Sequence, residues 1–348
     1  MKTYKLGELI TQRREKNNET GLPIRGVSRE GLIPPKQIDA DTSIYNVFYL
    51  RDFIFNPARM ELNSIAFNDK YEKAICSSLY EVFYVHKEDI VLPEYLKLIV
   101  KQDWFTRYCE FLGQGSAREY CRFANISEIN IELPDIETQK KAVYCDKVIN
   151  ERIALKRRIN DNLDSIAQTV YQQMFEANPD RNSWTSGNVG DVIQLQRGHD
   201  LPRSEMNGGD YPVAGSTGTI GYHDQYTTPA PAIVMGRSGN IGNPRLYLCN
   251  CWAHNTSLYV KDYGTCNPFW AFYMLKNLNY EGFKGGSAVP TLNRNDIHSV
   301  NITIPPEEIQ KSFADQVLPL ITHKERNQVE ISALEDFCST ILATISSR

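Results

Sequence analysis

Two stretches of the chain show the same change of hydrophobic period beside a proline. Apolar residues alternate with polar ones over 129–133, up to Pro134, and again over 300–304, up to Pro305. A period of two predicts a half-buried strand. Beyond each proline the apolar residues recur every three or four positions, which predicts a long amphipathic helix. Each half of the chain is therefore predicted to end in a strand that leads directly into a long helix.

The apolar positions of the two predicted helices form heptad-like seams. They are Ala142, Ile149, Ile153, Leu163, Ala167, Val170 and Met174 in the first helix, and Phe313, Leu320, Ile331, Leu334, Cys338, Ile341 and Ile345 in the second. Such seams are typical of helices that pack along their length at a shallow angle, so we expect the two helices to pack on each other. The alternative is that each helix lies on its own domain. Pro319 removes one backbone hydrogen bond and is expected to kink or restart the second helix.

The strand and the helix belong to an internal repeat. Residues 115–134 align without gaps to residues 286–305, and the same offset of 171 pairs Gln139 with Gln310 further on. A repeat of this length implies that one structural unit is present twice.

Each copy has room for a globular domain in front of its terminal strand. A second match, Lys5–Ile10 with Asn188–Ile193 at an offset of 183, marks the start of both domains and makes the first about a dozen residues longer. Short apolar runs bounded by turn residues predict strands. In the first domain these are Val47–Leu50, Ile54–Phe55, Ile75–Cys76 and Val82–Val85, followed by a helix over Glu94–Phe105, and in the second they are Ala232–Met235, Leu246–Leu248 and Ser257–Val260, followed by a helix over Pro268–Lys276.

The predicted fold class is therefore α/β, with one α/β domain and one long helix present twice. A chain of 348 residues is long enough for two or three domains. The predicted boundaries are 1–134 for the first domain, 135–179 for the central long helix, 180–304 for the second domain and 305–348 for the C-terminal long helix.

The composition is that of an ordinary globular protein, and we expect a cytoplasmic location. Apolar residues make up 41% of the chain and charged residues 23%. The N-terminal sequence lacks the apolar core of a signal peptide, and no run of about 18 apolar residues occurs. The eight cysteines form no C-x-x-C pair, which favours buried reduced thiols over a zinc site.

The net charge of −4 counts against a protein that binds nucleic acid, because phosphate contacts normally need a basic surface. Basic and acidic residues almost balance in the first three segments, whereas 305–348 carries four basic and seven acidic side chains. A near-neutral domain can still bind DNA if its basic groups are clustered and partner subunits add positive potential.

The glycine-rich loops of the second domain carry groups suited to phosphates and base edges. They combine uncovered backbone N–H groups and hydroxyls with Arg197 and Arg237, and arginine is the side chain best shaped for the acceptor edge of guanine. The alternative is that glycines make hairpin turns while the arginines are merely solvated. The loop positions predicted to contact DNA are Arg25, Arg29, Arg59, Gln114, Ser116 and Arg118 in the first domain, and Arg197, Ser216, Thr217, Tyr222, Arg237, Lys284 and Ser287 in the second.

The second half resembles the specificity subunit of type I restriction-modification systems. The motifs that carry the resemblance are Gly215–Gly221, Gly236–Gly242, Ala253–Thr256, Gly286–Leu292 and Pro305–Lys311. They span most of 186–348, and in the first half the resemblance is clear over 115–175. The first copy departs from the second at Arg118–Tyr120, where the second has Val289–Thr291. The family's loop geometry therefore cannot be carried over to the first domain at these positions.

The resemblance implies two target-recognition domains separated by two long antiparallel, coiled-coil-like helices with a pseudo-two-fold axis. Each domain would read one half of a split double-stranded DNA target, and the helices would set the gap between the halves. Two methylation subunits, which bind S-adenosylmethionine, would dock on the helices, and a motor-nuclease subunit that uses ATP and Mg²⁺ could join. No cofactor is expected in this chain.

Motifs for catalysis are missing from the sequence. Asn56-Pro57-Ala58 and Asn267-Pro268-Phe269 lack the second proline of an amino-methylation motif, and no G-x-x-x-x-G-K-[ST] loop occurs. The main hypothesis is thus a non-catalytic DNA-specificity subunit. The alternatives are the specificity module of a methyltransferase-only or other defence complex and, in a different class, a protein-interaction scaffold, which the acidic balance favours.

Overall fold

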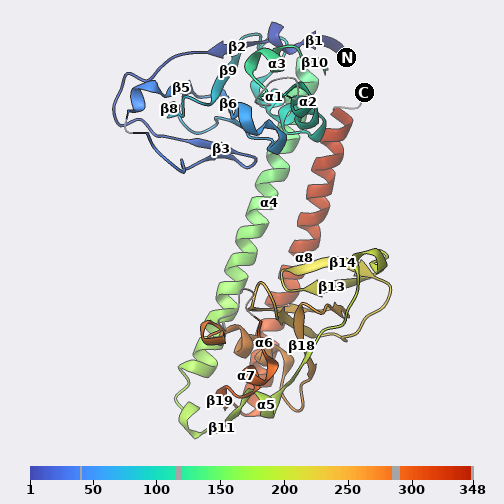
Figure 1. Ribbon diagram of the computed structural model, residues 1–348. Coiled ribbons are helices and arrows are strands. Elements are labelled where there is room, and N and C mark those ends of the chain that lie inside the picture. Colours follow the sequence, from blue (N-terminus) through green and yellow to red (C-terminus); the bar gives the residue numbers. More distant parts are fainter. Residues whose placement is uncertain (40, 114–119, 284–290, 346–348) are drawn as a thin grey trace. The chain divides into compact units, whose positions relative to one another are not determined.

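The computed structural model describes residues 1–39, 41–113, 120–283 and 291–345, and its contacts divide the chain into two units. The first unit consists of residues 1–155 and the end of the chain from residue 330, and the second of residues 156–329. Helices α4 (Ile136–Tyr171) and α8 (Glu307–Ile345) contribute residues to both units (Figure 1). The predicted boundaries at 134, 179 and 304 instead divide the globular domains from the long helices. They are not tested by the division into two units and stay predictions.

The centre of the first unit is an antiparallel four-stranded sheet in the order β2-β9-β6-β7. Its strands are β2 (Ile10–Arg13), β9 (Glu81–Val85), β6 (Phe53–Phe55) and β7 (Ile65–Phe67). The rings of Phe53 and Phe83 stack with their centroids 4.9 Å apart, and both side chains are fully buried. This aromatic pair anchors the core against which helix α1 (Pro93–Val100) packs its buried face.

Shorter elements surround this sheet. The strand pairs are β1 (Lys2–Lys5) with β10 (Asn130–Leu133), β3 (Gly26–Ser28) with β4 (Gly31–Ile33) and β5 (Asn46–Tyr49) with β8 (Lys73–Cys76). The helices are α2 (Asp103–Gly113) and α3 (Phe123–Ser127), with 3-10 turns at Leu6–Glu8, Thr42–Ile44 and Pro57–Leu62.

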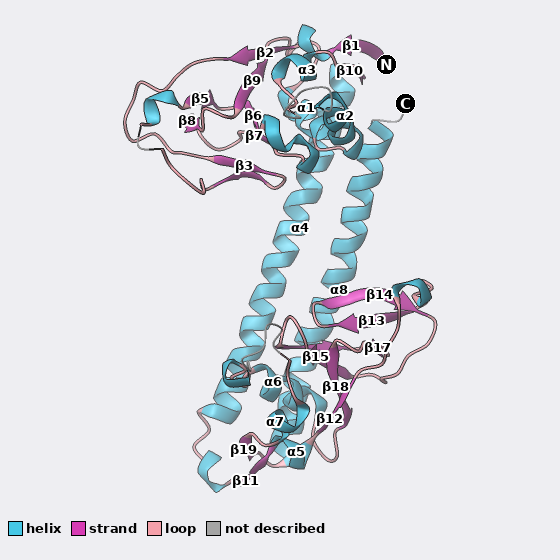
Figure 2. Ribbon diagram, in the orientation of Figure 1, coloured by secondary structure: helices cyan, strands magenta, loops and turns pink. Residues whose placement is uncertain are grey.

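The second unit repeats the strand order of the first. Its four-stranded sheet runs β12-β18-β15-β16, built from β12 (Gln194–Arg197), β18 (Ser257–Asp262), β15 (Ala232–Gly236) and β16 (Gly242–Tyr247). Figure 2 shows the first three of these strands side by side. Beside it lie β13 (Tyr211–Gly215), β14 (Gly218–His223) and β17 (Trp252–Ala253), and β11 (Thr185–Asn188) pairs with β19 (Asn301–Ile304). The helices are α5 (Val189–Val192), α6 (Pro268–Lys276) and α7 (Arg294–His298).

Glycine accounts for the short match at the start of each domain. A Cβ on Gly7 would lie 2.9 Å from Cβ of Ser127, and a Cβ on Gly190 would lie 3.1 Å from Cβ of His298. Gly7 and Gly190 are equivalent in the repeat, and so are Ser127 and His298. Each glycine therefore lets the first turn of its domain approach the short helix before the terminal strand.

A buried glutamine accounts for the match beyond the terminal strand. Gln139 Nε2 donates to the carbonyl groups of Ile90 and Pro134, and its Oε1 accepts from the backbone N–H of Leu92 at the start of α1. The equivalent Gln310 donates to Pro305 and accepts from the N–H of Asn267 at the start of α6. The glutamine thus joins α4 to the start of α1 in the first unit and α8 to the start of α6 in the second.

The two long helices are antiparallel, as the contacts within the second unit establish. Nζ of Lys156 donates to Oδ1 of Asn327 at 3.0 Å, and further along α4 Asp164 accepts from Lys324 at 2.5 Å. In the first unit the buried Ile149 and Ile153 of α4 pack with Ile331 of α8. The prediction that the helices pack on each other is confirmed.

The alternative arrangement also holds for part of each helix. Ala142 and Val143 of α4 pack against the core of the first unit, and Phe313 and Val317 of α8 belong to the core of the second unit. The end of α4 also contributes Ala167 and Tyr171 to the core of the second unit. On each long helix, one part of the apolar stripe packs on the other long helix and another part packs on a domain.

Two expectations about helices were wrong in detail. The helix predicted over Glu94–Phe105 is broken at residues 101–102, and α2 starts afresh at Asp103, an acidic residue that stabilises a helix N-terminus. Helix α8 runs through Pro319 without the restart that was one of the two outcomes expected there. None of the helices in the described ranges is long and apolar enough to cross a membrane.

Candidate nucleic-acid interface

Three loops of the second unit meet at one edge of its sheets. They are the β13–β14 turn, the loop 236–242 between β15 and β16, and the loop 254–256 that leads into β18. The backbone N–H of Ser216 donates to Oγ1 of Thr256 at 3.3 Å, and the N–H of Arg237 donates to the Thr256 carbonyl at 2.9 Å. Thr256 therefore connects all three loops.

Glycine makes this convergence possible. A Cβ on Gly236 would lie 1.6 Å from the carbonyl oxygen of Asn240, so no other residue fits there without moving the loop. Gly218 and Gly242 have φ angles of +121° and +73°, which L side chains rarely adopt. The predicted glycine-rich turns are confirmed as turns, and their close packing presents the polar residues between them.

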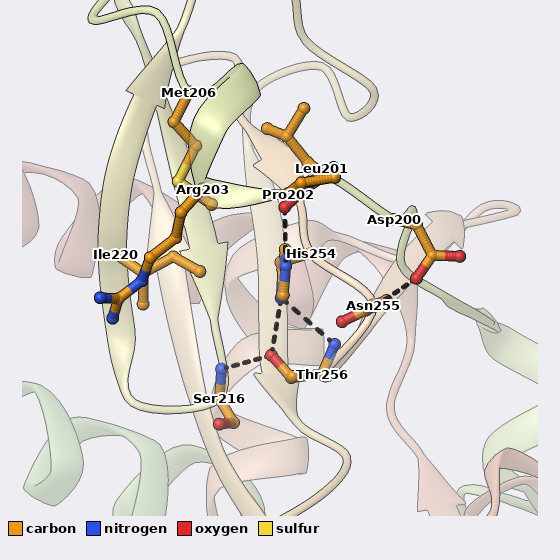
Figure 3. A pocket seen from close by; sticks show the side chains of 10 residues that line it. All are labelled: Asp200, Leu201, Pro202, Arg203, Met206, Ser216, Ile220, His254, Asn255 and Thr256. Carbon is orange, nitrogen blue, oxygen red and sulfur yellow. Dashed lines mark hydrogen bonds between the residues drawn. The ribbon is translucent and has the colours of Figure 1, made fainter.

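A fourth segment, residues 198–203, lies against the loop 254–256. A Cβ on Gly198 would lie 2.1 Å from the carbonyl oxygen of His254, and the next N–H, that of His199, donates to the carbonyl of Ala253 at 2.8 Å. This close backbone contact brings Asp200 beside Asn255, whose side-chain amide donates to the Asp200 carboxylate (Figure 3).

The His254 imidazole holds these segments together. One ring nitrogen, Nδ1, lies 3.0 Å from Oγ1 of Thr256, and the other, Nε2, lies 3.3 Å from the carbonyl oxygen of Leu201 (Figure 3). A carbonyl oxygen can only accept, so Nε2 donates to Leu201, and in the neutral tautomer that allows this bond Nδ1 accepts from the Thr256 hydroxyl. The Thr256 hydroxyl oxygen can then still accept from the backbone N–H of Ser216. Each donor in this series of hydrogen bonds therefore has one acceptor.

These segments enclose a cleft with a volume of about 460 Å³. Leu201, Met206 and Ile220 line it with apolar surface, while Arg203 and Asn255 provide donors and an acceptor (Figure 3). Within the described ranges no three His, Cys, Asp or Glu side chains are placed to hold a metal ion together. The chemistry that this surface offers is hydrogen bonding and shape recognition.

Two arginines of the second domain, Arg203 and Arg237, lie on these segments, and two more lie on strands that border them. Arg197, Arg203, Arg237 and Arg245 are four of the nine basic residues of 180–304. The guanidinium of Arg245 donates to the carbonyl of Thr217, and Arg197 and Arg203 are exposed. Such clustering is what a near-neutral domain needs to bind phosphates.

The contacts predicted in the second domain are partly brought together. Ser216, Thr217 and Arg237 belong to the converging loops, and Arg197 ends the strand that leads into residues 198–203. Tyr222 lies on β14 with 52% of its side chain exposed. Lys284 and Ser287 lie outside the described residues.

The contacts predicted in the first domain lie on separate segments. Arg25 precedes β3 and packs over the ring of Tyr71, to whose hydroxyl it donates at 2.7 Å. Arg29 is in the β3–β4 turn with 78% of its side chain exposed, and Arg59 is exposed in the 3-10 segment Pro57–Leu62. Gln114, Ser116 and Arg118 lie outside the described residues.

Sequence reasoning missed a lysine that supports the β3–β4 turn. The Lys101 ammonium donates to the carbonyls of Arg29 and Ile65, both at 2.7 Å. Burial, with Lys97 and Arg29 nearby, lowers the pKa of Lys101 to about 8. No local pattern marks this residue, because its partners lie 36 and 72 positions away in the chain.

Sequence reasoning also missed Asp200, Arg203 and Asn255. Asn255 stands inside one of the motifs quoted for the family resemblance, yet no member of that motif was chosen as a contact. The signal was present at Gly198-His199-Asp200, a glycine followed by polar residues directly after a strand, but only the tertiary contact shows which loop it meets.

A family model, "Type I restriction modification DNA specificity domain", matches residues 52–165 and 182–333. Two curated proteins are similar over parts of the chain. The HindI type I restriction enzyme specificity subunit of Haemophilus influenzae is 29% identical over 89 residues, which are 25% of this chain and 19% of that protein. The MjaIX specificity subunit of Methanocaldococcus jannaschii is 21% identical over 297 residues, 73% of this chain and 68% of that protein.

Solved structures share the fold over the whole chain. The S subunit of a type I restriction-modification system from M. genitalium has a TM-score of 0.66 at 15% identity and covers 100% of this chain and 96% of its own. A chain from a study of the assembly and conformational transition of the type I R-M system has a TM-score of 0.52 at 19% identity, covering 99% and 97%. At these identities the similarity establishes the fold.

Proposed function

This chain belongs to the type I restriction-modification DNA specificity family, and we propose that it is the subunit that selects the DNA target of such a complex. The proposal assigns it a split target, one half read by each domain. Methylation and, where a motor-nuclease subunit is present, restriction would be carried out by partner subunits at the target that this chain selects.

One observation carries the proposal. The two units repeat the same four-stranded sheet, in the orders β2-β9-β6-β7 and β12-β18-β15-β16, but differ in the elements around it. The first has the β3–β4 hairpin, whereas the second has the β13–β14 hairpin and its converging loops. A common framework with different loops is suited to reading two different half-sites that belong to one target.

The long helices support docking of two copies of a partner. Ile166 on α4 and Phe337 on α8 are 171 residues apart, the offset of the repeat, and their side chains are 50% and 55% exposed. Single exposed apolar side chains are common on protein surfaces, so the support comes from their equivalence in the repeat. Equivalent exposed positions on both helices would receive two identical methylation subunits.

The partner subunits would supply the chemistry. The methylation subunits would bind S-adenosylmethionine, and the motor-nuclease subunit would use ATP and Mg²⁺, while this chain contributes binding and specificity. As a non-catalytic subunit it would need only hydrogen-bond donors, acceptors and shape, which is what the loops of the second unit present. The acidic balance of the last helix also favours partners that add positive potential around the DNA.

The direct test is methylome sequencing of cells that carry this gene together with the partner genes of its operon. We expect one split motif that disappears when this gene is deleted. Assembled subunits without any split motif would overturn the proposal. A split motif without restriction of unmethylated DNA would instead identify the specificity module of a methyltransferase-only complex.

DNA binding by the assembled complex gives a second test. Phosphate contacts release counterions, so affinity should fall steeply as salt rises, and Arg237→Ala should make that dependence shallower. Affinity that does not change with salt would favour a protein-interaction scaffold instead. Glu176→Ala, an exposed acidic position between the first long helix and the second domain, is a suitable control.

A further inference from the structure

We propose that Arg197 and Asp200 read one G·C base pair together in the half-site bound by the second unit, with Asn255 positioning the Asp200 carboxylate. The inference rests on the proposed function and deepens it by naming side chains, a base pair and the chemistry of recognition. Neither Asp200 nor Asn255 was among the contacts expected from the sequence.

The two charged side chains stand side by side at an open edge. Arg197 ends β12 with 54% of its side chain exposed, and Asp200, three residues later, is 77% exposed. A guanidinium nitrogen of Arg197 lies 3.8 Å from Oδ1 of Asp200. This is close enough for attraction but too long for a hydrogen bond, so the guanidinium keeps donors for a ligand.

The backbone under this pair is rigidly supported. Gly198 lies so close to the loop 254–256 that a Cβ there would be 2.1 Å from the carbonyl oxygen of His254. The N–H groups of Gly198 and His199 donate to the carbonyls of Ser257 and Ala253 at 3.0 and 2.8 Å. A supported backbone reduces the entropy lost when the two side chains engage a ligand.

Asn255 orients the carboxylate. Its amide nitrogen donates to Oδ1 of Asp200, the same oxygen that faces Arg197. The other oxygen, Oδ2, forms no hydrogen bond or ion pair with the described residues and points away from Asn255 (Figure 3). The pair therefore presents guanidinium donors and, a few ångströms away, one free carboxylate acceptor.

That arrangement is complementary to the major-groove edge of a G·C pair. Guanine presents two acceptors, O6 and N7, which suit arginine, and cytosine presents the N4 amino donor, which suits a carboxylate. With an A·T pair, arginine would keep only the adenine N7 acceptor, while the adenine amino group would face a guanidinium donor and thymine O4 would face the carboxylate acceptor.

An alternative role for Asp200, without base recognition, is to neutralise Arg197 and lower the affinity for any DNA. The two roles differ in what they do to sequence preference. Neutralisation predicts that Asp200→Ala raises affinity for all duplexes equally, whereas base reading predicts that the preference for G·C over A·T falls at one position. A hydrogen-bonded base contact is worth about 1–3 kcal/mol of discrimination, which is about 5- to 150-fold.

The experiment uses the full chain assembled with its partner subunits, once the wild-type motif is known from methylome sequencing. Methylation rates are measured on duplexes in which each position of each half-site is replaced in turn. We expect Asp200→Ala and Arg197→Ala each to relax the same single G·C position, by about 5-fold or more, and to leave the other half-site unchanged. Replacing the guanine at that position by 7-deazaguanine, which lacks the N7 acceptor, should weaken the wild type and not Arg197→Ala.

The matched control is Asp224→Ala, an exposed acidic residue at the far end of β14 from the converging loops. It should leave the motif unchanged. The inference is overturned if Asp200→Ala alters no position, if it raises methylation of all sequences alike, or if the two variants relax different positions. Absence of any split motif in the wild type would instead overturn the proposed function, so the two failures are distinguishable.

Discussion

Replacing the buried Gln310 by methionine should loosen the start of α6 without altering the equivalent helix of the first unit. Gln310 is 3% exposed. Its Oε1 accepts from the N–H of Asn267 at 2.9 Å, and its Nε2 donates to the carbonyl of Pro305 at 2.9 Å. Methionine fills a similar volume but makes neither bond, so the packing is kept while two polar groups lose their partners.

The magnitude follows from these two groups. A buried donor or acceptor left without a partner costs about 1–3 kcal/mol. Some of that cost is recovered where water reaches Asn267, which is only partly buried, so we expect a loss of about 2–4 kcal/mol. Since 1.4 kcal/mol corresponds to a factor of ten, protection from exchange should fall by about 30-fold or more.

Hydrogen exchange followed by mass spectrometry reports each helix separately, which matters because a chain with two units need not unfold in one step. In Gln310→Met, amides of α6 should exchange faster, while those of α1 should keep their wild-type rates. Gln139→Met should show the reverse pattern, because Gln139 makes the corresponding bonds at α1. Lys311→Met, at the exposed neighbouring position, is the control.

The reasoning would be refuted by a change of less than about threefold in α6. Equal loss of protection from hydrogen exchange in α1 and α6 would refute it too. That result would mean that Gln310 stabilises the whole fold rather than the contact between α8 and α6. The reciprocal pattern is what equivalent roles of Gln139 and Gln310 predict.

Three further predictions concern other contacts. Gly198→Ala forces a Cβ to within 2.1 Å of the His254 carbonyl and should lower the free energy of unfolding by about 1–3 kcal/mol, read as a lower midpoint in urea; an unchanged midpoint would contradict the contact. The pKa of Lys101 is about 8 in the folded chain and 10.5 in the unfolded chain. Between these pH values the unfolded chain binds one more proton than the folded chain, so the free energy of unfolding should rise as the pH goes from about 8 to 10.5. Lys101→Met should lack that rise in pH-dependent urea titrations, and an identical pH profile would count against the lowered pKa. Asn160→Leu should cost about 1–3 kcal/mol because it leaves the buried Asn327 amide without its 2.8 Å partner, and adding Asn327→Leu should recover part of the loss; simple additivity of the two substitutions would show that the amides do not interact.

The secondary structure was largely predictable from local pattern. The terminal strands follow from a period of two, and the strands at 232–236 and 81–85 from short apolar runs bounded by turn residues, with the helix Pro268–Lys276 after them. Such patterns of apolar and polar residues involve only neighbours along the chain, so they can be read from the sequence without knowledge of the fold. The break at residues 101–102 and the uninterrupted passage of α8 through Pro319 were missed because tertiary packing decided them.

The repeat was visible in the sequence, but its cause was not. The offsets of 171 and 183 identified equivalent positions, among them Gln139 with Gln310 and Gly7 with Gly190. Only the structure shows that the glutamines join two helices and that the glycines admit a neighbouring backbone. Both roles depend on groups brought together from distant parts of the chain.

The sequence by itself determined the duplicated α/β plan, the long helices and the family, because these are encoded in periods, offsets and ordered motifs. The tertiary structure decided which polar residues share a surface. Arg197 could be proposed from its residue type and its loop, whereas Asp200 and Asn255 became a pair only through the contact of Gly198 with His254. A hydrogen bond between side chains 55 positions apart follows from close backbone packing, which no local pattern specifies.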